Sequence, residues 1–125
     1  MTSYDPMNSP DPEDWLEMDE QERIMLVASY HKQAGEKLPN RRLHATIHVI
    51  VENQIAEGVE KVRETLRRLD GEGLDRHDAI HAIGSVLTGH IWNLMREGPP
   101  SSDHNEPYFH DLESLTAIGW LKGAY

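Results

Sequence analysis

The sequence contains no cysteine and has only 12 basic residues against 22 acidic ones, which gives a formal net charge of −10 at pH 7. Without thiols, disulfides, iron–sulfur clusters, thiolate zinc sites and cysteine nucleophiles are excluded, so any metal must be bound by nitrogen and oxygen. The acidic balance argues against nucleic-acid binding, because neutralising phosphates requires a concentrated basic surface. A chain of 125 residues has the length of one domain.

Long hydrophobic runs are also missing. No stretch approaches the roughly 20 apolar residues that a membrane-spanning helix needs. Residues 1–14 have neither the basic start nor the apolar stretch of a secretory signal. We therefore expect a soluble, cytoplasmic protein with no membrane partner and no nucleic-acid partner.

The distribution of polar and apolar residues predicts an arm followed by helices. Residues 1–14 are rich in Pro, Asp, Ser and Asn, a composition that buries too little apolar surface to offset the cost of ordering. Asp19, Asn40 and Asp75 each stand as a candidate N-cap before a stripe of helical period. No strand-like alternation lies between the turn signals. We predict a mobile acidic N-terminal arm over 1–14 and a single all-α domain over 15–125, a compact bundle of four to five helices.

Two histidine motifs carry the most specific chemical signal. His44, His48 and Glu52 follow one another at intervals of four residues, and His77 and His81 repeat that interval later in the chain. Residues at i and i+4 lie one turn apart on the same face of a helix, so their side chains can converge on one atom. Two such helices that face each other could enclose a metal ion.

The apolar surroundings of these histidines favour a metal site over a simple core role. A lone histidine on an apolar helix face is more often a hydrogen-bonded core residue than a ligand. Four such imidazoles without a shared partner would leave several unsatisfied groups, at roughly 1 to 3 kcal/mol each. We predict one divalent transition-metal ion, zinc or iron before other metals, held by His44, His48, His77 and His81. Glu52 is predicted to be a fifth ligand or an orienting partner.

The remaining histidines receive weaker interpretations. His31 is interpreted as a core or site-lining residue, and His90, His104 and His110 as surface or loop residues. The Glu-x-x-His pattern of ferritin-like di-iron bundles is absent from both histidine motifs. The late His-x-x-x-x-Asp that a hemerythrin-like site would need is absent as well.

These patterns resemble a bacterial family of small all-helical domains of unknown function that carry paired His-x-x-x-His motifs. The residues that carry the resemblance are Trp15-Leu16, Asp19-Glu20, Tyr30-His31, His44, His48, the run 51–56, the run 76–84, Leu115-Thr116-Ala117 and Trp120. The resemblance implies a compact helical domain and leaves the activity open.

Three functions are consistent with the sequence. The first is a helical protein that binds one divalent metal through histidines on two facing helices. The second is a metalloenzyme, an iron-dependent oxygenase or a hydrolase, with an open metal position and Glu52 as the base. The third is a metal-free homodimeric interaction module in which the histidines form a polar core. Whether the protein is an enzyme is not decided by its residues.

Overall fold

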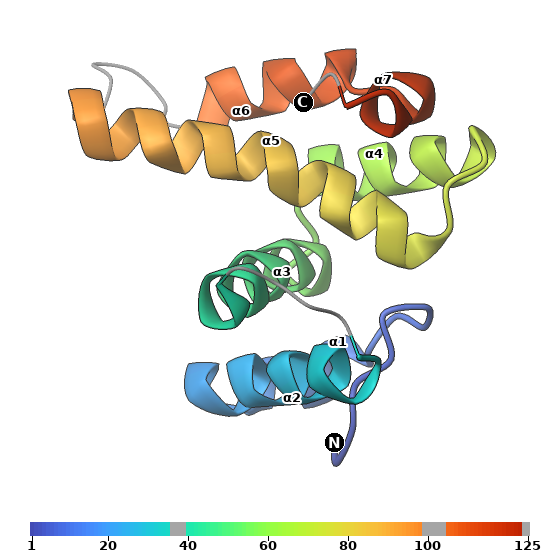
Figure 1. Cartoon of the computed structure of the whole chain (residues 1–125), viewed down its shortest axis with the longest axis vertical. Helices are drawn as coiled ribbons and strands as arrows, with labels where there is room; N and C mark the ends of the chain where they lie inside the picture. The colour runs from blue at the N-terminus through green and yellow to red at the C-terminus, as the bar shows by residue number, and fades with distance from the viewer. Residues whose placement is uncertain (36–39, 99–104, 124–125) are drawn as a thin grey trace. The chain divides into compact units, whose positions relative to one another are not determined.

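The computed structural model describes residues 1–35, 40–98 and 105–123, and every regular element within these ranges is an α-helix (Figure 1). The all-α prediction is confirmed, and five of the seven helices in these described ranges have ten or more residues. Among the described residues, no helix is long and apolar enough to cross a membrane. The helices are α1 (Pro12–Glu17), α2 (Glu20–Gln33), α3 (Arg41–Ala56), α4 (Glu60–Gly71), α5 (Arg76–Glu97), α6 (Asn105–Ser114) and α7 (Ala117–Leu121).

Contacts between residues divide the chain into two units, Met1–Val59 and Glu60–Tyr125. In the first unit, α1 and α2 both pack against α3. Two predicted caps are confirmed here: the Asp19 side chain accepts from the backbone N–H of Glu22, and that of Asn40 accepts from Leu43, both at 3.0 Å. The predicted boundaries, an arm over 1–14 and one domain over 15–125, stay a prediction.

A polar network fixes α1 and the start of α2 against α3. The indole Nε1 of Trp15 donates to Oδ1 of Asn53 at 2.8 Å, and the guanidinium of Arg23 donates to the same oxygen at 3.0 Å. Arg23 also donates to the backbone carbonyls of Leu16 and Met18, at 2.9 and 2.7 Å. Because Asn53 lies on α3, the network sets the register of the helix that carries the first histidine motif.

The second unit is built around α5, the longest helix, which contacts α4, α6 and α7. Asp75 caps α5, as predicted, by accepting from the backbone N–H of Asp78 at 2.8 Å. Arg68 of α4 and Glu72, which directly follows that helix, contact the C-terminal helices. The Arg68 guanidinium donates to the carbonyl of Leu112 at 2.9 Å, and the Glu72 carboxylate accepts from the N–H of Ala117 at 2.9 Å.

Candidate metal centre

Three buried or half-buried histidines gather in the first unit, one from α2 and two from α3. His31 lies one turn after Val27 on the apolar face of α2, and both side chains are buried. His44 and His48 lie one turn apart on α3, as their spacing predicts, and His48 is buried while His44 is half-buried. Packing of α2 against α3 therefore brings a histidine from each helix to one place.

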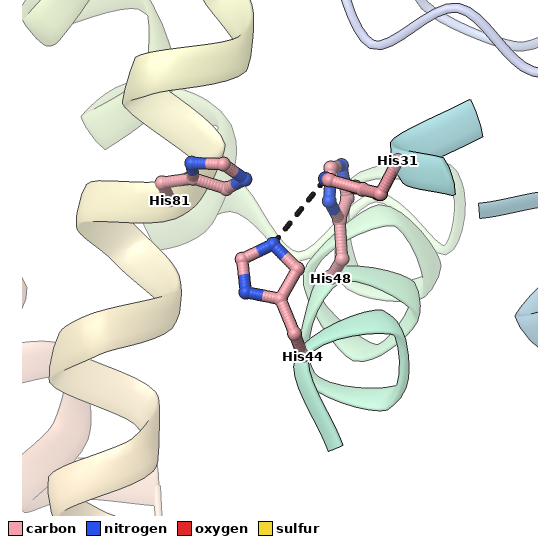
Figure 2. A group of neighbouring side chains, drawn as sticks. All are labelled: His31, His44, His48 and His81. Carbon is pink, nitrogen blue, oxygen red and sulfur yellow. Dashed lines mark hydrogen bonds between the residues drawn. The ribbon is translucent and has the colours of Figure 1, made fainter. Parts of the chain in front are cut away.

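The three imidazoles face one another closely (Figure 2). Nε2 of His44 lies 3.3 Å from Nε2 of His31. The ring centroid of His31 is 4.7 Å from that of His44 and 5.2 Å from that of His48. A ligand nitrogen from each of the three lies within 4.8 Å of the others. The chain therefore carries a histidine cluster with the spacing that a metal ion could occupy.

The proton positions on His31 follow from its neighbour. Nδ1 of His31 lies 2.8 Å from the backbone carbonyl oxygen of Val27. A carbonyl oxygen can only accept, so Nδ1 carries the hydrogen and donates it. In the neutral ring the lone pair is then on Nε2, the nitrogen that faces His44.

Tyr4 and Glu52 belong to the polar surroundings of His48. The phenolic oxygen of Tyr4 lies 2.7 Å from Nε2 of His48, and the same hydroxyl donates to Oε2 of Glu52. Because the hydroxyl hydrogen goes to Glu52, the phenolic oxygen accepts from His48, so Nε2 of His48 carries a hydrogen. Glu52 is only 1% exposed. Its carboxylate thus reaches His48 through the phenol of Tyr4.

The second histidine motif lies on α5, in the other unit. His77 and His81 are half-buried, and their rings pack edge to face with centroids 4.2 Å apart. Each motif therefore occupies one face of one helix, as its spacing predicts.

The neighbouring Asp78 has a raised pKa. Burial raises this pKa, and the negative charge of Asp75 raises it further, while His77 acts in the opposite direction.

Two residues at this centre had a smaller role, or none, in the sequence analysis. His31 was interpreted as a core or site-lining residue, and its position on the apolar stripe of α2 was the available signal. Tyr4 falls within the segment predicted to be a mobile arm, yet its side chain is 5% exposed and packs on Trp15, Tyr30 and His48. Its polar sequence neighbours gave no signal for this burial. His104 lies outside the described residues.

Comparison with known proteins supports the resemblance seen in the sequence. A family model described as a domain of unknown function (DUF1841) matches residues 7–113. No curated protein and no solved structure matches the chain. The matched range includes both histidine motifs and begins after Tyr4.

Proposed function

This chain belongs to the DUF1841 family of domains of unknown function, and we propose that it binds one divalent transition-metal ion through His31, His44 and His48 of the first unit, with His81 as a fourth ligand that the spacing of the second histidine motif predicts. The proposal keeps three of the four histidines expected from the sequence. It assigns His31 as a ligand and gives His77 a supporting role.

The observation that carries the proposal is the 3.3 Å distance between Nε2 of His44 and Nε2 of His31. Zinc binds histidine nitrogens at about 2.0 to 2.1 Å, so two ligands of a tetrahedral ion stand roughly 3.3 to 3.4 Å apart. Without an ion the two nitrogens are joined by a hydrogen bond (Figure 2), and an ion would replace that hydrogen bond with little movement of the rings. The pair therefore fits one edge of a coordination tetrahedron.

His81 is proposed as the fourth ligand. Three histidines leave one position of a four-coordinate ion to be filled, and the His-x-x-x-His spacing of the second motif predicts a ligand for that position. The ring of His77 packs edge-on against that of His81, so His77 would limit the orientations of its neighbour.

Glu52 is proposed as an orienting partner and not as a ligand. Its carboxylate accepts from Tyr4, which is itself in contact with His48. Four neutral imidazoles leave the two positive charges of the ion uncompensated, and a buried carboxylate close by reduces that cost. Metal-bound histidines commonly have such a carboxylate behind them.

The ligand set favours some metals over others. Nitrogen donors suit zinc, iron, nickel and copper, and the chain has no cysteine thiolate to select softer ions. A zinc ion held by four histidines would have no open position, as in structural sites. With zinc, a structural or metal-sensing role therefore follows. With iron, which accepts more than four ligands, chemistry at a further position would be open.

Metal content of tag-free protein, measured by inductively coupled plasma mass spectrometry, tests the proposal. We expect about one ion per chain in the unaltered protein and its loss in His44→Ala and in His81→Ala. His110→Ala is the matched control, because His110 is an exposed histidine outside the cluster. A folded protein that contains no ion, even after reconstitution with zinc or iron(II), would overturn the proposal.

A metalloenzyme is a second candidate, and the exposure of His44 favours it. His31 and His48 are each 2% exposed, whereas His44 is half-buried, so solvent can approach the cluster on the His44 side. Water or a substrate could then replace one ligand, with Glu52 as a base. Oxygen consumption by the iron(II)-loaded protein, or ester hydrolysis by the zinc-loaded protein, would support this activity if His44→Ala changed its rate.

A metal-free homodimer is the third candidate, and two exposed apolar side chains on α5 favour it. Trp92 and Met95 are 60% and 77% exposed and lie three residues apart on that helix. A dimer in sedimentation equilibrium that persists in chelator and is lost in Trp92→Glu would support this function.

A further inference from the structure

We propose that Tyr4 is a positioning residue of the metal centre, and that metal binding and docking of the N-terminal segment, residues 1–11, favour each other. The inference rests on the proposed metal site. It adds a role for a segment that precedes the first helix. It also specifies which nitrogen of His48 meets the ion.

The first step is the choice of nitrogen. Nε2 of His48 is 2.7 Å from the phenolic oxygen of Tyr4, and the Tyr4 hydroxyl is directed to Glu52. Nε2 must therefore be the donor, so His48 would coordinate the ion through Nδ1. His31 shows the opposite arrangement, since its Nδ1 donates to Val27 and its Nε2 faces His44. Two different hydrogen-bond partners thus set two different ligand atoms.

The second step is the effect of the ion on the contact with Tyr4. An uncoordinated imidazole exchanges its hydrogen between the two nitrogens, and the form protonated on Nδ1 has nothing to donate to the phenol. Coordination through Nδ1 keeps the hydrogen on Nε2. It also makes that N–H a stronger donor, because the metal withdraws electron density from the ring. Metal binding therefore strengthens the hydrogen bond to Tyr4.

The third step is the attachment of residues 1–11 to the first unit. The buried side chains of this segment are Tyr4 and Pro6, whereas Met1 and Met7 are exposed. The Tyr4 ring packs on Trp15 at a centroid distance of 5.8 Å and edge-on against Tyr30 at 6.2 Å. A change in the hydrogen bond of the Tyr4 hydroxyl therefore acts on one of the two buried side chains that attach the segment to the first unit.

Linkage makes the effect reciprocal. If the ion stabilises the docked position of Tyr4, docking of Tyr4 must raise the affinity for the ion by the same factor. The N-terminal segment would then dock more firmly in the metal-loaded protein and be released more readily without metal. Such a segment can report metal occupancy to a protease or to a binding partner.

The test measures zinc affinity by competition with a chromophoric chelator in the full chain and in three variants. Tyr4→Phe removes the hydroxyl and keeps the packed ring, and we expect it to lower the affinity about 10- to 100-fold. Glu52→Gln should lower it in the same direction, because Tyr4 loses its charged acceptor. Tyr30→Phe is the matched control, since it removes a hydroxyl from a ring that packs on Tyr4 and His31. That control should change the affinity by less than about threefold.

Two further measurements separate positioning from simple packing. The visible d–d bands of the cobalt(II)-loaded protein should shift in Tyr4→Phe more than in Tyr30→Phe, because the Tyr4 hydroxyl is hydrogen-bonded to His48, whereas Tyr30 meets His31 through the edge-to-face packing of its ring, which Tyr30→Phe keeps. Hydrogen exchange of the amides of residues 1–11 should slow on zinc addition in the unaltered protein. The zinc effect should be much smaller in Tyr4→Phe.

The outcomes distinguish this inference from the function on which it rests. Zinc binding that is the same in Tyr4→Phe and in the unaltered protein, with equal exchange in residues 1–11, would overturn the role of Tyr4 and leave the metal site standing. An unaltered protein that binds no metal would overturn both. Weaker zinc binding in Tyr4→Phe with unchanged apo-protein unfolding would support the inference, because the loss is then not one of folding.

Discussion

Nε2 of His31 and Nε2 of His44 lie 3.3 Å apart, although the two histidines belong to different helices and are 13 residues apart in the chain. The contact depends on the packing of α2 against α3, and that packing depends on apolar residues such as Val27, Ala45 and Val49, all fully buried. The histidines are thus held together by the core around them. Because the two side chains are already held close together, less conformational entropy is lost when a metal ion binds.

Removing the metal should lower the melting temperature. Metal bound only to the folded state stabilises it by mass action, by about 2.7 kcal/mol when the metal concentration is 100 times Kd. We expect chelation to lower the melting temperature measured by circular dichroism. The His44→Ala protein should have the same melting temperature with and without chelator. Equal melting of the metal-loaded and chelated forms of the unaltered protein would contradict the prediction.

Replacing Asn53 with alanine should destabilise the first unit. The Asn53 oxygen accepts from both Trp15 and Arg23, and the loss of an acceptor for a buried donor costs about 1 to 3 kcal/mol. Urea unfolding measures the change, followed by tryptophan fluorescence in a Trp92→Phe and Trp120→Phe background in which Trp15 is the remaining tryptophan. Asn53→Asp keeps an oxygen at this position and is the matched control. An unchanged midpoint in Asn53→Ala would show that the shared oxygen contributes little.

Much of the fold could be predicted from the sequence, because it depends on local signals. Asp19, Asn40 and Asp75 were predicted as caps from their place before an apolar stripe, and each accepts the expected backbone N–H. A cap acts over three residues, so its evidence lies within a short window. The division of contacts at Val59 and Glu60 depends on packing between distant residues and had no such signal.

The candidate site was predictable only in the part that one helix determines. The spacing of His44 and His48 placed both on one face of α3, as the structure has them. The contact of Tyr4 with His48 spans 44 residues, and Tyr4 stands among polar residues that suggested a mobile arm. Its burial depends on a pocket formed by Trp15 and Tyr30, which only the packed unit provides.

The stability of the second unit should fall at acid pH through Glu72. The backbone N–H of Ala117 lowers the pKa of Glu72 below the ordinary glutamate value of about 4.5, and the Arg68 guanidinium lowers it further. Because the folded pKa is below the unfolded one, ionised Glu72 stabilises the folded state above about pH 4.5, and this stabilisation is lost as the pH falls through the folded value. We expect Glu72→Gln to be less stable at pH 7 by about 0.5 to 1 kcal/mol.

The control for this pH dependence is Glu60→Gln. Glu60 pairs with Arg67, but both side chains are about two-thirds exposed, so the pair is screened by solvent. Urea unfolding at pH 7 and at pH 3 should show a difference between Glu72→Gln and the unaltered protein that shrinks at the lower pH. A difference of constant size at both pH values would mean that the charge of Glu72 does not carry the effect.

His31→Ala and His77→Ala should differ in their effect on metal binding, and the comparison decides between two ligand sets. If His31 is a ligand, its removal leaves three nitrogens and should abolish stoichiometric binding. The ring of His77 packs edge-on against that of His81. Replacing His77 with alanine should lower the metal affinity by no more than about tenfold, as expected for a supporting residue. Because His31 also donates to the carbonyl of Val27, His31→Ala must first be shown to fold, by circular dichroism. Retained binding in a folded His31→Ala protein, with loss in His77→Ala, would restore the ligand set predicted from spacing alone.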